Sequence, residues 1–314
     1  MPESTLPARI AAVEAGGTKF VCAVMAGSRP ELLAQTELPT GDDPADCLRR
    51  VGAWFDQQIR TLGPVDAVGV ATFGPADIDP QSNGYGTITS TPKPGWAQAP
   101  LLAPLQQALG GVPAGFDTDV NGAALGEHLF GAARGLEDFV YVTMGTGIGG
   151  GGMARGRLLH GLGHPEMGHL RIPRASGDDF PGACPYHGDC WEGLCSGPAL
   201  EARPGRAAAD IPADDPVWRL AARDTGLALA NIVCTLSPRR IVIGGSVRKA
   251  GALGQSQFFA LVRRELQQAL HEYVASPSLV GDAIEQYVVP PGLGDAAGIT
   301  GAWALGRRAW EAAH

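Results

Sequence analysis

The sequence contains no apolar run that approaches the ~20 residues needed to span a membrane. Its first residues also lack a basic segment followed by an apolar core, so no secretory signal is expected. Only six of the 314 residues are cysteines, and their spacing is too uneven for the disulfide framework of a secreted protein. We therefore expect a protein of the reducing cytoplasm that does not associate with membranes.

Positive charge is also scarce. The net charge is -8 and the pI is near 5.4, which argues against a nucleic-acid partner. The first glycine turn, at Gly16-Gly17, also lacks two common phosphate-binding signatures, namely the eight-residue P-loop and the glycine spacing of the dinucleotide fingerprint. The folds that carry those signatures are not indicated.

Four side chains in the middle of the chain match the ligand preference of zinc. Cys184, His187 and Cys190 are spaced three apart in a loop rich in glycine and proline, and His169 precedes them. Two sulfur and two nitrogen donors complete a tetrahedral shell, which predicts a structural zinc ion with no open position. The alternatives are a disulfide between Cys184 and Cys190, or four residues without a common role.

Two carboxylates flank these candidate ligands. Glu166 lies three residues before His169, which places both on one face of a helical turn, and Glu192 follows Cys190. A metal at one ring nitrogen of His169 would leave the other nitrogen available for hydrogen bonding. Carboxylates and an imidazole of fixed orientation suit sugar hydroxyls, which both donate and accept hydrogen bonds. This pattern predicts a polyol-binding site.

Glycine is abundant, at 45 of 314 residues, and it clusters in turns that follow apolar strands. Backbone amides in such turns can bind phosphate oxygens, and Glu14 could hold Mg²⁺ through water. The strand–turn–strand plan occurs twice, about half a chain apart, which suggests duplicated α/β domains facing one cleft. Ordinary glycine hairpins are the alternative for the first turn. The turns lie at Gly16-Gly17-Thr18-Lys19, at Gly145 to Gly152 and at Gly244-Gly245.

Polar residues gather where a predicted strand runs into an alanine-rich helix, at Asp117, Thr118, Asp119 and Asn121. Asp119 could serve only as a helix N-cap, but the group is denser than one cap requires. A carboxylate here could act as the general base of a phosphoryl transfer. The long irregular segment 77–96 ends with Trp96 and is either a ligand-contacting loop or an ordinary surface loop.

Hydrophobic periodicity predicts helices over 43–62, 216–236 and 256–273, with Ser256 as the N-cap of the third. A buried strand is predicted over 65–72, and a final helix rich in small residues begins in 293–305. Strands and helices therefore alternate in an α/β plan, and the chain length favours two domains.

Taken together, these motifs resemble the ROK family of sugar kinases, within the actin-like ATPase superfamily, and its fructokinase branch in particular. Glu14-Ala-Gly-Gly-Thr-Lys19, Thr143 to Gly152 and Ile243-Gly-Gly-Ser246 resemble the two phosphate motifs and the adenosine motif. Pro165 to His169, with Cys184 to Glu192, resembles the zinc and sugar signature. The resemblance implies two actin-like, ribonuclease H-like α/β domains with a cleft between them and a zinc-binding loop.

The implied domains are residues 1–118, with a C-terminal helix at about 300–314 packing back on them, and 119–299, which carry the zinc segment 164–192. The resemblance implies ATP, Mg²⁺ and structural Zn²⁺ as cofactors and a homodimer as the assembly. Asp119 would be the general base. Residues expected to contact the sugar are Thr118, Glu166, His169, Glu192 and Trp96; those expected to contact the nucleotide are Gly16, Gly17, Thr18, Lys19, Thr146, Gly147, Gly244 and Gly245.

Three residues depart from the usual family pattern. Glu14 stands where Asp is usual, Thr118 stands where Asn usually precedes the base, and His187 replaces a cysteine. The last two features, with Thr91 to Trp96, look like the fructokinase branch. The implied activity is an ATP:hexose 6-phosphotransferase that makes fructose 6-phosphate and ADP; mannose, glucose or a broad hexose range is the alternative.

Two other classes of protein are less consistent with the sequence. A sugar-responsive repressor of the same family needs an N-terminal DNA-binding domain, and the first strand is already expected near Arg9. A zinc hydrolase needs an open coordination position, which four protein ligands would not leave.

Overall fold

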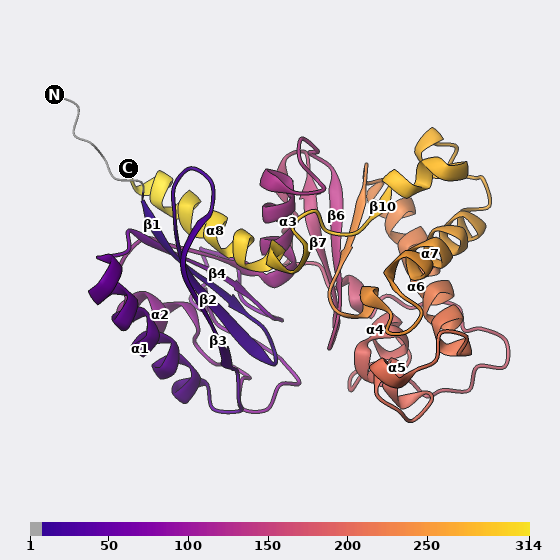
Figure 1. Cartoon of the computed structure of the whole chain (residues 1–314), viewed down its shortest axis with the longest axis horizontal. Helices are drawn as coiled ribbons and strands as arrows, with labels where there is room; N and C mark the ends of the chain where they lie inside the picture. Colours follow the sequence, from indigo (N-terminus) through magenta and orange to yellow (C-terminus); the bar gives the residue numbers. More distant parts are fainter. Residues whose placement is uncertain (1–7) are drawn as a thin grey trace. The chain divides into compact units, whose positions relative to one another are not determined.

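The computed structural model describes residues 8–314, which form two compact units (Figure 1). The first unit comprises the described part of Met1–Gly131 with His160–His164 and Ala296–His314, and the second comprises Ala132–Leu159 and Pro165–Asp295. Each contains a five-stranded sheet, so the predicted α/β class with two sheets is confirmed. The helix that begins at Asp119 belongs to the first unit, and a single boundary between residues 118 and 119 stays a prediction.

The first sheet has the strand order β3-β2-β1-β4-β5. Its first three strands form an antiparallel meander, whereas β4 and β5 run parallel to β1, each after a crossover that contains a helix. The carboxyl ends of β1, β4 and β5 therefore meet at one edge. The strands are β1 Arg9–Ala15, β2 Lys19–Ala26, β3 Glu31–Pro39, β4 Ala67–Thr72 and β5 Ala114–Thr118; the helices are α1 Pro44–Leu62, α2 Leu102–Ala108, α3 Asp119–Phe130 and α8 Ala297–Ala313.

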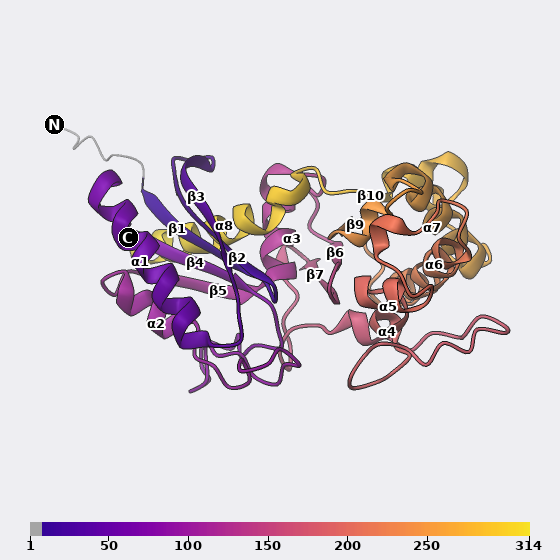
Figure 2. The same cartoon turned by 60° about the horizontal axis from the view of Figure 1, so that its bottom comes forward.

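Helices cover both faces of this sheet. Alternate residues such as Val68 and Val70 point into the core beneath α1 and α2, while their neighbours face α8, which packs on β1, β4 and β5 (Figure 2). Small residues let α8 approach closely: a Cβ at Gly69 would lie 1.8 Å from the Ala302 carbonyl oxygen. Position 69 must therefore remain glycine.

Local sequence accounts for α1, which confirms the helix predicted over 43–62. Asp43 caps its first turn by accepting hydrogen bonds from the backbone N–H groups of Ala45 and Asp46, and Pro44 occupies the first turn. The helix ends at Gly63, whose φ of 89° is unfavourable for other residues. Its buried face carries Cys47, Val51 and Phe55.

The second sheet has the order β10-β9-β6-β7-β8, with β6 and β7 as an antiparallel hairpin and β9 parallel to β6. Its core is formed with α4, α6 and α7. No helix in residues 8–314 has the length and apolarity that a membrane crossing requires. The strands are β6 Phe139–Met144, β7 Ile148–Ala154, β8 Arg157–Leu158, β9 Ile241–Gly244 and β10 Val288–Val289; the helices are α4 Trp191–Cys195, α5 Gly197–Ala202, α6 Pro216–Leu236 and α7 Gln255–Leu270.

The predicted helix over 216–236 is confirmed as α6, with Asp215 as its N-cap and Pro216 in the first turn. The helix predicted from about Ser256 to Tyr273 is confirmed as α7, although its N-cap residue and its C-terminal end were predicted wrongly. Gly254, with φ of 84°, precedes the helix, so Ser256 lies inside it, and His271 ends it in a left-handed conformation before Tyr273 is reached.

Candidate functional site

Two carboxylates come together in the first unit, Glu14 near the end of β1 and Asp119 at the start of α3. The Glu14 carboxylate accepts a hydrogen bond from the backbone N–H of Ile299, and desolvation, followed by the charge of Asp119, raises its pKa from 4.5 to about 7. A Cβ at Gly298 would lie 2.1 Å from Glu14 Oε1, so the longer glutamate is accommodated by a glycine in α8. This pair is suited to a cation, which would favour the ionised form of both groups.

Asp117, two residues before Asp119, has a different environment. It is buried, and its Oδ1 accepts hydrogen bonds from the backbone N–H of Thr118 at 2.8 Å and from Asn121 Nδ2 at 2.9 Å. Its Oδ2 lies 2.8 Å from His160 Nε2, and this hydrogen bond raises the pKa of the histidine. Asp119 remains partly exposed, with Oδ1 accepting from the Val120 N–H at 2.8 Å. Of the two, Asp119 is the carboxylate that a ligand can reach.

Thr118 and Trp96 were both expected to contact a sugar. In the structure, both side chains make contacts within the protein. Thr118 is buried, and its hydroxyl caps α3 by accepting a hydrogen bond from the backbone N–H of Asn121 at 3.3 Å. Trp96 is fully buried; its ring packs against Phe20 and Phe73, and its indole N–H donates to the Gly41 carbonyl at 3.0 Å. We therefore correct the expectation for Trp96, whose ring belongs to the core.

The first glycine turn joins β1 to β2. The backbone N–H of Gly16 donates to the Lys19 carbonyl at 3.0 Å, and the Thr40 hydroxyl donates to the Gly16 carbonyl at 2.7 Å. Thr18 and Lys19 are exposed, while Gly17 is half-buried. The Lys19 ammonium lies 2.6 Å from the Glu37 carboxylate, so a phosphate at this turn would compete with Glu37 for it.

In the second unit, the β6–β7 turn packs against the turn that follows β9. Gly245 has φ of 82°, and a Cβ there would lie 2.2 Å from the Met144 carbonyl oxygen, while a Cβ at Gly244 would lie 2.0 Å from the Tyr141 hydroxyl. Both positions therefore require glycine. Thr146 at the tip is exposed, and Gly147 is half-buried. The two predicted nucleotide-contacting turns of this unit are thus neighbours.

The four predicted zinc ligands converge on one point. The ligand atoms of His169, Cys184, His187 and Cys190 all lie within 4.8 Å of one another. His169 Nδ1 is 3.5 Å from Cys190 Sγ and 3.8 Å from Cys184 Sγ, which is 3.7 Å from His187 Nδ1. Zinc bond lengths near 2.1 Å for nitrogen and 2.3 Å for sulfur place tetrahedral ligand atoms about 3.3–3.8 Å apart, so these residues fit the ion.

A tight loop brings the ligands together. Cys184 and Gly188 exchange backbone hydrogen bonds of 3.2 and 2.9 Å, and Ala183 N–H donates to the Gly193 carbonyl at 2.8 Å. A Cβ at Gly193 would lie 1.8 Å from the Gly188 carbonyl oxygen. We call this loop, residues 183–193, the knuckle. Glycine is needed here because two backbone segments pass so closely.

The two predicted sugar carboxylates lie beside the knuckle. Glu166 Oε2 is 4.0 Å from His169 Nε2, the ring nitrogen that faces away from the cysteines. Desolvation, with a smaller contribution from Glu192, raises the pKa of Glu166. Glu192 Oε2 accepts a hydrogen bond of 2.8 Å from the backbone N–H of Ile148. Glu192 therefore joins α4 to the glycine turn of β6 and β7, a contact that spacing alone did not indicate.

The chain is similar to known proteins along almost its whole length. The family model described as "ROK family" matches residues 10–309. A Bacillus subtilis protein provisionally assigned as a fructokinase is 44% identical over 300 residues, covering 96% of each chain, and a fructokinase from Pediococcus pentosaceus is 38% identical, covering 96% of this chain and 98% of its own. The crystal structure of a ROK hexokinase from Thermus thermophilus superposes with a TM-score of 0.74 at 28% identity, covering 97% of this chain and 99% of that one.

Proposed function

The chain belongs to the ROK family, and we propose that it is an ATP-dependent fructokinase that makes fructose 6-phosphate and ADP. This proposal rests on the likeness of the chain to fructokinases, at 38% to 44% identity along almost its whole length. The family match, over residues 10–309, includes the glycine turns, Asp119 and the knuckle. Fructose and ATP are the substrates, and mannose or glucose is the alternative sugar.

Asp119 is the proposed general base. It takes the proton of the sugar 6-hydroxyl as that oxygen forms a bond to the γ-phosphorus of ATP, while the bond from phosphorus to the β,γ-bridging oxygen breaks and ADP leaves. The partial exposure of Asp119 supports this role, whereas both oxygens of Asp117 already accept hydrogen bonds. Asp117 instead holds the start of α3 in place.

Mg²⁺, bound with ATP, would neutralise phosphate charge, and Glu14 is the residue proposed to hold it. A carboxylate with a pKa of about 7 beside a second carboxylate is stabilised in its charged form by a divalent cation. Amides of the glycine turns are proposed to bind the nucleotide, at Gly16, Gly17, Thr18 and Lys19, at Thr146 and Gly147, and at Gly244 and Gly245.

His169, Cys184, His187 and Cys190 are proposed to hold a structural zinc ion. The ion would fix the His169 ring through Nδ1, and Nε2 would then be directed toward a sugar hydroxyl beside Glu166. Glu166 and Glu192 are proposed to accept hydrogen bonds from other hydroxyls. We also propose that the protein is a homodimer and that it is located in the cytoplasm.

A coupled ADP-release assay tests the function. Purified protein receives ATP and Mg²⁺ with fructose, mannose or glucose in parallel, and the Asp119→Asn variant serves as the background for contaminating kinases. The proposal is supported if the unaltered protein prefers fructose and the Asp119→Asn variant shows no such activity. Activity restricted to another hexose keeps the kinase chemistry and changes the substrate, and release of ADP at the background rate with all three sugars contradicts both.

A further inference from the structure

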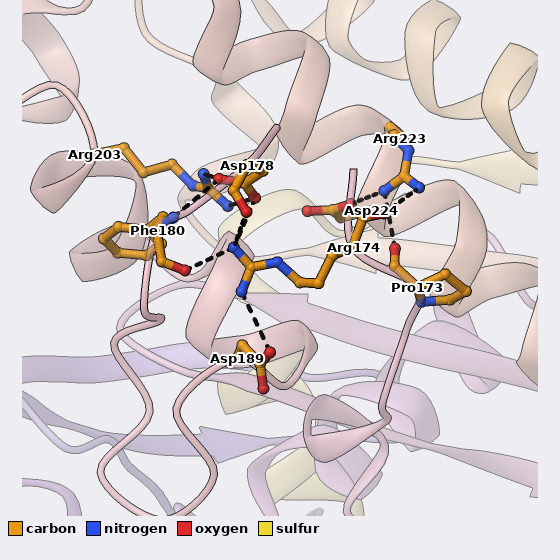
Figure 3. Close-up of polar contacts among 8 residues, drawn as sticks. All are labelled: Pro173, Arg174, Asp178, Phe180, Asp189, Arg203, Arg223 and Asp224. Carbon is orange, nitrogen blue, oxygen red and sulfur yellow. Dashed lines mark hydrogen bonds and ion pairs between the residues drawn. The ribbon is translucent and has the colours of Figure 1, made fainter. Parts of the chain in front are cut away.

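A cluster of charged residues lies between the knuckle and two helices of the second unit (Figure 3). It forms around residues 170–182, an irregular segment that connects the candidate ligand His169 to the knuckle. A zinc ion would fix both ends of this segment but not its middle. Two of the charged residues lie in the middle, three contact it, and one pairs with a residue that does; none of them has a part in the function proposed above. They are Arg174, Asp178, Asp189, Arg203, Arg223 and Asp224.

Arg174 occupies the centre of the cluster. Its Nη1 donates to Asp189 Oδ2 at 3.3 Å, while its Nη2 donates to the carbonyls of Asp178 and Phe180 at 3.0 and 2.7 Å and lies 3.1 Å from Asp178 Oδ2. Asp189 belongs to the knuckle, directly between the candidate ligands His187 and Cys190. One guanidinium thus bridges the knuckle and the connecting segment.

The far side of the segment is fixed to α5 and α6. Arg203, immediately after α5, makes a bidentate contact with Asp178 at 2.7 and 3.0 Å, and both side chains are almost fully buried. Arg223 of α6 donates to the carbonyls of Pro173 and Arg174 at 3.1 and 3.3 Å. A continuous chain of contacts therefore runs from the knuckle through Arg174 to both helices.

The composition of this cluster favours a geometric role over a stabilising one. Burying such charges carries a desolvation cost that their attraction offsets only in part. Two polar atoms, Arg174 Nε and Asp224 Oδ2, are buried without a hydrogen-bond partner, which adds to that cost. Apolar side chains would stabilise this region as well, but they would not direct Asp189 and its neighbouring ligands.

We propose that Arg174 is a positioning residue that holds the knuckle against α5 and α6, so that the zinc ion is retained and His169 and Glu166 keep their orientation toward the sugar. The inference rests on the proposed zinc site and kinase function. Arg171 provides a matched control, because it pairs with the other oxygen of the same Asp189 but is exposed, at 62% against 27% for Arg174.

The experiment compares Arg174→Gln, Asp189→Asn, the double variant and Arg171→Gln. Zinc content is first measured in the unaltered protein, and release is then followed with a coloured chelator. Arg174→Gln and Asp189→Asn should each release zinc about tenfold faster, as is usual when a group that orients a metal ligand is lost. The double variant should be little faster than either single variant, because the contact between Arg174 and Asp189 is lost in all three. Arg171→Gln should stay within about twofold of the unaltered protein, since exposed pairs contribute little.

Kinetics provide a second readout that general destabilisation would not reproduce. In Arg174→Gln the KM for the sugar should rise several-fold, while the KM for ATP and kcat stay within about twofold. If the unaltered protein contains no zinc, the proposed zinc site fails, and the role of Arg174 fails with it. If it contains zinc but folded Arg174→Gln releases it at the unaltered rate, only the role of Arg174 is overturned. If Arg174→Gln does not fold, Asp189→Asn tests the same contact. The inference would then be overturned if Asp189→Asn released zinc as slowly as Arg171→Gln does.

Discussion

Replacing Glu14 by glutamine should stabilise the protein, and the gain should grow with pH. The pKa of Glu14 is raised from 4.5 to about 7, chiefly by desolvation. The folded protein therefore binds more protons than the unfolded chain between these values, and the free energy of unfolding falls as pH rises from 4.5 through 7. At about 1.4 kcal/mol per pKa unit, the full cost of ionising Glu14 is about 3 kcal/mol above pH 7.

Glutamine cannot ionise and avoids this cost. The difference in free energy of unfolding between Glu14→Gln and the unaltered protein should be about 2–3 kcal/mol larger at pH 8 than at pH 5. Urea titrations at both pH values, without Mg²⁺ or nucleotide, measure it. The difference between two proteins removes the pH dependence of the groups that do not interact with Glu14.

A control variant and a functional readout complete this test. Glu31→Gln changes an exposed carboxylate of the same sheet, and its effect should vary little between the two pH values. Glu14→Gln should also respond more weakly to Mg²⁺ in the kinase assay, since it lacks the charge proposed to hold the ion. An equal stability difference at pH 5 and pH 8 would refute the reasoning about Glu14.

Three further predictions concern the candidate site. Asp119→Asn should lower kcat by roughly 10²–10⁴-fold with little change in the KM for fructose, and near-normal turnover would remove Asp119 from the mechanism. Removal of zinc should abolish fructose binding and make the knuckle sensitive to proteolysis before the first unit unfolds; zinc-free protein with full activity would contradict the structural role. His160→Gln should destabilise the protein more at pH 6 than at pH 9, because a histidine whose pKa is raised by Asp117 contributes stability below its unfolded pKa and loses it as pH rises; thermal unfolding that shifts equally at both pH values would exclude this contact.

Local features of the sequence were sufficient to predict several parts of the structure. Helices α1 and α6 follow from apolar periodicity and from an Asp-Pro start, and the glycine hairpins follow from apolar strands on both sides of a turn. The ligands Cys184, His187 and Cys190 are close in sequence, so their spacing already restricts them to one loop. In each case the chemistry needed lies within about 20 residues.

Features that depend on contacts distant in sequence could not be predicted. His160 and Asp117 are 43 residues apart, and no local pattern marks them as partners. Trp96 was expected at a ligand because its loop is irregular, yet the core is completed by that ring. Strand β3 was not expected, because as an exposed edge strand it lacks the clear alternation of a half-buried strand. Whether a loop residue is buried depends on the distant segments that pack against it, which a local sequence pattern does not show.

The position of α8 has a consequence for how the protein is made. This helix completes the first unit by packing on β1, β4 and β5, yet it follows the whole second unit in the chain. During synthesis, the sheet face that bears Gly69 and Gly115 stays uncovered until α8 has been made, and the whole second unit has been translated by then. We expect the second unit to fold before the first unit is complete during synthesis.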